Sequence, residues 1–130
     1  MFCPIELEVP KSTPRTNPAT KILQLRDGII RNWYLGFPHG CFNRVRAQVF
    51  EFEHQILPQR EGESLYWSGY VFVIPDEYVL EEEPYEIELR AWNTDTTNPH
   101  TILLGVDLEE IPEETAEGLL SRLLKALVGE

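Results

Sequence analysis

The chain of 130 residues suits a single domain with one core, and its 42% hydrophobic and 25% charged residues are ordinary for a folded protein. A net charge of −11 disfavours a role in nucleic-acid binding, because an acidic surface repels the phosphate backbone. The apolar runs are far shorter than the roughly 20 residues of a membrane-spanning helix, and the start, MFCPIELEVP, lacks the features of a signal peptide. We therefore expect a protein that is cytoplasmic when synthesised and has no membrane partner.

The charge is distributed unevenly along the chain. Residues 1–60 contain 8 Lys and Arg against 5 Asp and Glu, whereas residues 61–130 contain 3 against 17. Excess acid keeps a protein soluble, which is one interpretation of this pattern. A basic front half and an acidic rear half also permit head-to-tail attraction between copies, which is the second interpretation.

The first third of the chain predicts a short strand, a proline-rich segment and then two strands joined by a turn. IELEV (5–9) alternates apolar and acidic residues, as a half-buried strand does, and PKSTPRTNPAT (10–20) has three prolines and no periodicity. We therefore expect residues 1–20 to form an extended arm. In KILQLRDGIIRNWYLGF (21–37), two apolar runs flank an Asp-Gly pair, which predicts a hairpin.

GFPHGCF (36–42) places glycines and a proline where a strand would not tolerate them, which predicts a turn. We expect Phe37 and Phe42 to anchor both ends of this turn in the core and Cys41 to pack as a small apolar residue. A catalytic pair of Cys41 with His39 is disfavoured, because nothing nearby marks an oxyanion hole.

The middle of the chain continues the strand pattern. In RVRAQVFEFEHQIL (44–57) the apolar phase slips at 49–50, which predicts a β-bulge. LYWSGYVFVI (65–74) predicts a strand ended by Pro75-Asp76, with Trp67 in the core. YEIELRAW (85–92) and HTILLGVDL (100–108) alternate cleanly. Their inward residues are expected to be Tyr85, Ile87, Leu89 and Ala91 in the first, and Ile102, Leu104, Val106 and Leu108 in the second.

The end of the chain predicts a helix. PEETAEGLLSRLLKALVG (112–129) has acid in its first turn, Arg122 and Lys125 later and a glycine stop, so we expect an amphipathic α-helix over 113–128. Its leucine stripe packs either on its own domain or on a neighbouring copy. About seven strands and one terminal helix, without a βαβ rhythm, indicate a mainly β protein: one antiparallel β-sandwich domain over 1–130.

Chemical motifs are sparse. Two cysteines, Cys3 and Cys41, provide neither a disulfide framework nor a metal quartet, and we expect reduced thiols. The histidines at 39, 54 and 100 fall in different expected elements, without the spacing of metal ligands. The acidic runs EEEPYEIE and DLEEIPEE are typical of a solvated face rather than of a glycosidase pair. We expect no cofactor, no metal and no catalytic residue.

The segment RAWNTDTTNPHT (90–101) is the strongest candidate for binding. Trp92 falls on the outward side of its strand beside a polar loop, where it can anchor a partner protein or stack on a sugar ring. Alternatively, Trp92 covers an edge of the core while Asn93, Asp95 and Thr96 cap the loop. The candidate binding residues are Phe37, His39, Trp92, Asn93, Asp95 and His100.

The string GFPHGC…HQILP…EEPYEIELRAWNTDTTNPHT resembles small, largely uncharacterised β-sandwich proteins of tailed-phage or prophage-like gene clusters. The resemblance covers about residues 12–102. Its matching positions are Gly36–Cys41, His54-Gln55, Pro58, Pro84 and Trp92–His100.

The resemblance implies a non-enzymatic structural role and supplies no catalytic residue. It points to a capsid decoration, cement or connector subunit that acts through contacts with other protein subunits, copies of itself included, and is incorporated into a virion or phage-like particle. The alternative is a carbohydrate- or protein-binding module that uses Trp92 and the loop 93–100. A small enzyme is the least supported of the three.

Overall fold

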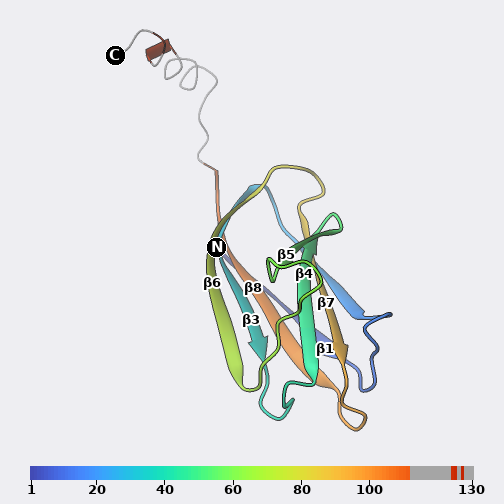
Figure 1. The fold of residues 1–130 in the computed structure, drawn as a ribbon. Helices are drawn as coiled ribbons and strands as arrows, with labels where there is room; N and C mark the ends of the chain where they lie inside the picture. The colour runs from blue at the N-terminus through green and yellow to red at the C-terminus, as the bar shows by residue number, and fades with distance from the viewer. Residues whose placement is uncertain (112–123, 126, 128–130) are drawn as a thin grey trace.

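A computed structural model of the chain describes residues 1–111 together with Leu124, Lys125 and Leu127. The described residues form eight β-strands in two layers (Figure 1). The strands are β1 (Phe2–Val9), β2 (Ala19–Gln24), β3 (Gly28–Phe37), β4 (Val45–Glu51), β5 (His54–Leu57), β6 (Tyr70–Leu80), β7 (Glu86–Asn93) and β8 (His100–Glu109). The helix expected over 113–128 lies outside the continuously described segment 1–111. No helix within the described residues has the length and apolarity to span a bilayer.

The strands form two four-stranded antiparallel sheets that face each other, which confirms the predicted sandwich architecture. The first sheet has the order β1-β8-β3-β6 and the second has the order β2-β7-β4-β5. Alternate residues of both sheets point into the core between them. The predicted inward faces of β7 and β8 are confirmed, because their central members are fully buried: Ile87, Leu89, Ala91, Ile102, Leu104 and Val106.

The hairpin predicted over 21–37 is wrong. β2 pairs with β7 in one sheet, whereas β3 pairs with β6 and β8 in the other. Gly28 lies where the chain passes from the second sheet to the first. A Cβ added to it would lie 2.7 Å from the carbonyl oxygen of Glu109. The glycine therefore permits close approach of β8 and does not form a tight turn.

The strand predicted over 5–9 is confirmed, but the extended arm predicted for 1–20 is wrong. Residues 2–9 form β1, which pairs along its whole length with β8, from Phe2↔Asp107 to Val9↔His100. The following loop is tied down by a hydrogen bond from Ser12 N to Asp95 O (2.8 Å). The alternating pattern extends further toward the N-terminus than expected, and it makes this segment an edge strand of the domain.

The β-bulge predicted at 49–50 is confirmed, since the register of β4 against β5 shifts between Val49 and Phe50. The apolar pattern of 44–57 nevertheless divides into two strands. Phe52 and Glu53 both adopt positive φ angles, 49° and 70°, and reverse the chain between β4 and β5. Phe52 is left 51% exposed at this turn.

β6 runs beyond the end predicted for it. The strand continues through Pro75 and Asp76 to Leu80, because it is an edge strand, where a proline costs no interior hydrogen bond. Residues 65–69 lie outside the strand, and Trp67 is 51% exposed rather than in the core. Phe42, expected to anchor a turn in the core, is 71% exposed.

Candidate functional site

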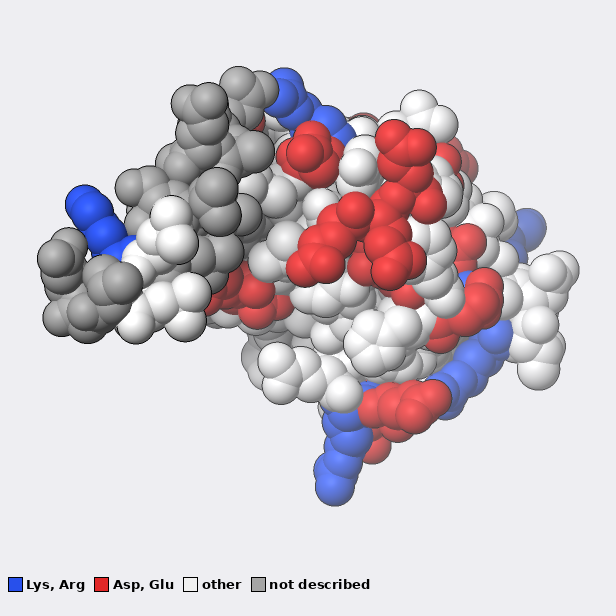
Figure 2. Space-filling view, turned by 90° about the horizontal axis from the view of Figure 1, so that it is seen from above, with Lys and Arg blue, Asp and Glu red and all other residues white. Residues whose placement is uncertain are grey.

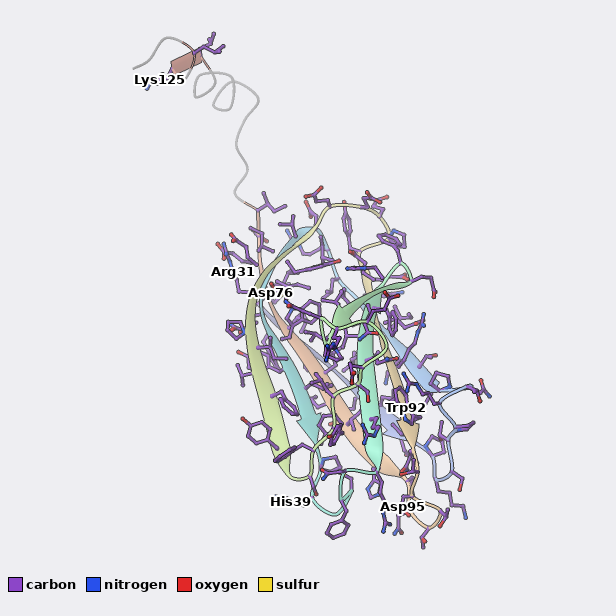
Figure 3. All side chains as sticks on the ribbon, in the orientation of Figure 1. Arg31, His39, Asp76, Trp92, Asp95 and Lys125 are labelled. Carbon is purple, nitrogen blue, oxygen red and sulfur yellow. The ribbon has the colours of Figure 1, made fainter. Side chains whose placement is uncertain are left out.

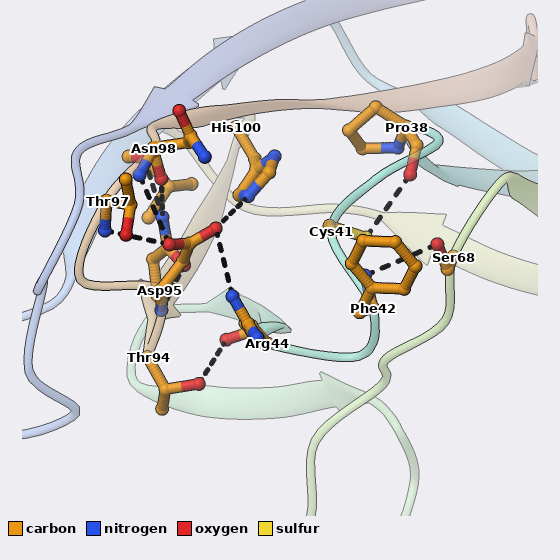
Figure 4. A network of polar contacts seen from close by, with 12 residues as sticks. Pro38, Cys41, Phe42, Arg44, Ser68, Thr94, Asp95, Thr97, Asn98 and His100 are labelled. Atoms are coloured by element: carbon orange, nitrogen blue, oxygen red, sulfur yellow. Dashed lines mark hydrogen bonds and ion pairs between the residues drawn. The ribbon is translucent and has the colours of Figure 1, made fainter.

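The loops that carry most of the predicted binding residues lie at one end of the sandwich. The β3–β4 loop, with His39, and the β7–β8 loop, with Asp95, meet at the lower end of the molecule in Figure 3. Figure 4 shows the polar contacts that join the two loops through Arg44. The arrangement brings Asn93, Asp95 and His100 together.

Asp95 is the centre of these contacts and is only 2% exposed. Its Oδ1 accepts hydrogen bonds from the amides of Thr97 (2.8 Å) and Asn98 (3.1 Å), and its Oδ2 lies 2.9 Å from Nε2 of His100. Arg44 Nη1 lies 3.6 Å from the same Oδ2. These groups, above all the hydrogen bond with His100, lower the pKa of Asp95 to about 2. The carboxylate is therefore ionised at neutral pH and its acceptor sites are occupied by its own chain.

Asn93 is 1% exposed and links three segments. Its Nδ2 donates to Val9 O (3.3 Å) and to Asn98 O (3.1 Å), and its Oδ1 accepts from the amide of Asp95 (2.9 Å). Both side chains thus fix the shape of the β7–β8 loop, as the capping interpretation of this segment expected. They do not offer polar groups to a ligand from outside.

Trp92 is 5% exposed, and the guanidinium of Arg15 from the β1–β2 loop lies over its ring, 4.9 Å from the centroid. A sugar ring needs an uncovered aromatic face on which to stack. The position of Trp92 therefore corresponds to the alternative in which it covers an edge of the core.

The β3–β4 loop also has a structural explanation for its unusual composition. Phe37 is 3% exposed, and Cys41 is fully buried, as predicted for a small apolar residue. The Cys41 Sγ lies within hydrogen-bonding distance of the carbonyl oxygens of Pro38 (3.2 Å) and Trp67 (2.9 Å). His39 packs against Gly69, where an added Cβ would collide with the imidazole. The thiol is thus enclosed and bonded to backbone oxygens, an environment unlike that of an exposed nucleophile.

An aromatic hollow that the sequence did not predict lies between the start of β6 and the segment that precedes it. The hollow measures about 440 Å³ and is lined by Ser64, Leu65, Tyr66, Trp67, Tyr70 and Phe72. Trp67 and Tyr70 are each 51% exposed, and their rings stand edge to face with centroids 6.4 Å apart. The signal was the aromatic run in LYWSGYVF, but a strand pattern places such residues in the core.

The hollow opens beside the free edge of β6. Val71 and Val73, on this strand, are 47% and 55% exposed, and residues 70–74 carry no charge. The other edge strands are protected in ways that discourage pairing: β5 has four residues, β1 carries Glu6 and Glu8, and β2 carries Lys21. The first half of β6 is therefore the least protected of the four edges.

The opposite end of the sandwich is acidic. Figure 2 looks down on this end and shows carboxylates gathered around it. They come from the loops and strand ends that meet there: Asp27, Glu51, Glu53, Glu81, Glu82, Glu83, Glu86, Glu109 and Glu110. The two ends of the domain thus differ in charge, since Lys11, Arg15 and Arg44 lie in the loops of the other end.

No group of three His, Cys, Asp or Glu side chains within the described residues is arranged to hold a metal ion. In comparisons with known proteins, no family model, no curated protein and no solved structure matches the chain.

Proposed function

We propose that the protein is an assembly subunit that binds an extended segment of another protein subunit along the first half of β6. This is how a decoration, cement or connector subunit of a phage-like particle would attach to its neighbours. One observation carries the proposal: residues 70–74 form an uncharged, exposed strand edge that opens directly on an aromatic hollow.

The register of β6 fits the addition of a strand. Phe72 lies opposite Leu35 and Tyr70 opposite Phe37, so both aromatic rings project toward the inner side of the first sheet. Val71 and Val73 project to its outer side. A strand paired with β6 would send every second side chain into the hollow and the others onto the valines. Backbone hydrogen bonds would give affinity, and the hollow would select the side chains.

The edge is already held in its binding conformation. β6 pairs with β3 from Tyr70 to Leu80, with one register shift between Ile30 and Asn32 on β3. The segment next to the hollow is fixed too, because Leu65 and Ala47 exchange two backbone hydrogen bonds of 2.9 Å. A preorganised edge loses little conformational entropy when a partner binds.

A polypeptide fits this site better than a sugar does. Carbohydrate sites combine an aromatic face with several convergent polar side chains. Here the lining includes no charged or amide side chain, and its side-chain polar groups are three hydroxyls and the indole N–H of Trp67. The one hydroxyl that is not phenolic, on Ser64, already has its Oγ 3.4 Å from Arg46 Nη1. The free backbone edge of β6 supplies the hydrogen-bonding groups that a peptide needs.

The test is a Val73→Lys substitution, which places a charge on the edge without disturbing the core, since Val73 is 55% exposed. Ile22→Lys on β2, an edge strand of the other sheet, is the matched control. Binding to each protein encoded beside this gene is measured by interferometry. We expect one partner whose Kd rises at least about tenfold with Val73→Lys, equivalent to about 1.4 kcal/mol, and stays within about twofold with Ile22→Lys.

Two results would contradict the proposal. The first is a partner that binds wild type and Val73→Lys equally well. The second is a glycan that binds the protein in an array and is lost with Trp67→Ala while no protein partner binds. That second result would make the hollow a carbohydrate site.

A further inference from the structure

We propose that copies of this chain associate head to tail, with the Phe42 side chain of one copy seated in an acid-rimmed hollow beside Phe52 of the next. This contact goes beyond the binding proposed for β6 and uses none of the residues of the aromatic hollow. Its two halves lie at opposite ends of the domain.

The first half is a rigid knob at the tip of the β3–β4 loop. Phe42 is 71% exposed, the largest exposed fraction among the aromatic side chains in the described residues. It adopts a positive φ of 48°, and its amide donates to Ser68 Oγ (3.3 Å). Arg44, two residues further on, has a half-exposed guanidinium whose Nη1 lies 3.6 Å from the buried Asp95 Oδ2, and its amide donates to Cys41 O (2.9 Å). The loop thus presents an aromatic ring beside a cation.

The second half is a small hollow at the acidic end. It measures about 180 Å³ and is lined by Glu51, Phe52, Val79, Glu81 and Glu82. Phe52 and Val79 form an apolar floor and are 51% and 38% exposed. Glu81 and Glu82 form an exposed rim, and no ion pair within the described residues engages either of them. Glu51 accepts a hydrogen bond from the Tyr78 hydroxyl (2.5 Å) and is thereby held in place.

The two halves match in chemistry and cannot meet within one chain. An aromatic ring flanked by a cation complements an apolar floor rimmed by carboxylates. The knob precedes β4 and Phe52 follows it, so the seven residues of that strand separate them by roughly 23 Å at about 3.3 Å per residue. The occupant of the hollow is therefore the knob of a second copy.

Such a contact joins different surfaces of two identical chains. A heterologous interface of this kind closes into a ring or continues as a filament. The charge difference between the ends orients the copies, because two acidic ends repel each other. The attraction should weaken as salt concentration rises, since part of it acts between exposed charges.

The test uses variants of both halves in sedimentation velocity over a wide range of protein concentration at low salt. Phe42→Ser removes the ring from an exposed position, so the fold should be unaffected. Arg44→Glu and Glu82→Arg each reverse one charge of the contact. Because Arg44 also pairs with Asp95, urea unfolding of Arg44→Glu shows whether the loop keeps its fold. Lys11→Glu is the matched control, because it makes the same charge change in another loop of the basic end.

We expect wild type and Lys11→Glu to associate with rising concentration. Phe42→Ser, Arg44→Glu and Glu82→Arg should each need at least a tenfold higher concentration for the same degree of association. An equimolar mixture of Arg44→Glu and Glu82→Arg should associate again, because each knob then finds a complementary rim.

Three results would overturn the inference: a wild-type chain that stays monomeric at every concentration, association of Phe42→Ser equal to wild type, or failure of the mixture to associate. Val73→Lys should leave self-association unchanged, and Phe42→Ser should leave binding along β6 unchanged. Failure of one proposal is therefore distinguishable from failure of the other.

Discussion

Asn93→Ala should destabilise the fold strongly if Asn93 holds the β7–β8 loop in shape. The substitution removes three hydrogen bonds: those from Nδ2 to Val9 O and Asn98 O, and that from the amide of Asp95 to Oδ1. A buried hydrogen bond contributes about 1 kcal/mol, and more when its partner is left unsatisfied. Because Asn93 is 1% exposed, we expect a total loss of about 3 kcal/mol in the free energy of unfolding.

Urea unfolding followed by fluorescence measures this loss. With a slope of about 1–3 kcal/mol/M for small proteins, the midpoint should fall by about 1 M or more at an unchanged slope. Thr94→Ala is the control, because its hydroxyl shares the acceptor Arg44 O with its own amide and little is left unsatisfied. A loss below about 1 kcal/mol for Asn93→Ala would refute the reasoning and return Asn93 to the set of binding residues.

Two further predictions concern the same loop and the crossing between the sheets. Because its pKa is lowered from 3.8 to about 2, Asp95 stabilises the folded state above pH 3.8, and this contribution disappears as the pH falls through about 2. The urea midpoints of wild type and Asp95→Asn should therefore converge between those pH values, and a constant difference would speak against the network with His100. Gly28→Asn should cost about 1–3 kcal/mol, since an added Cβ would crowd Glu109 O at 2.7 Å and Leu108 Cδ1 at 2.9 Å. A near-neutral effect would be consistent only with a turn that accepts asparagine.

The parts of the fold that were predictable from the sequence are those in which one face of a strand is buried. β7 and β8 alternate because one face of each strand is buried against the other sheet, where Leu89 and Leu104 are fully enclosed. The bulge in β4 was visible for the same reason, since an extra residue must shift the phase of the apolar positions.

Pairing between strands was not predictable in the same way. The Asp27-Gly28 pair is a local turn signal. It carries no information about the distant strands β7 and β8, which pair with β2 and β3 in place of a hairpin between those two. β1 illustrates a related limit. Prolines after Val9 indicated an arm, but they only end the strand, and β8 covers its whole length.

In the candidate site, too, local composition was predictable and contacts between distant segments were not. The polar loop 93–100 was identified from its composition, but burial of Asp95 and Asn93 depends on contacts with Val9 and Arg44 from distant segments. The aromatic hollow was missed because a pattern with period two assigns Trp67 to the interior. No local pattern reveals that β6 is the last strand of its sheet and leaves that side open.

The exposed aromatic residues and the charge have a common physical interpretation. Large apolar side chains stand exposed at chain reversals and at one strand edge, namely at Phe42, Phe52, Trp67 and Tyr70. Such surface promotes unspecific association unless net charge keeps copies apart. The net charge of −11 makes two copies repel each other when their acidic surfaces face each other. Only a partner that brings the opposite charge, or an uncharged strand, reaches the apolar surface. In both proposed contacts, therefore, apolar area provides affinity, and charge determines which partner binds and in which orientation.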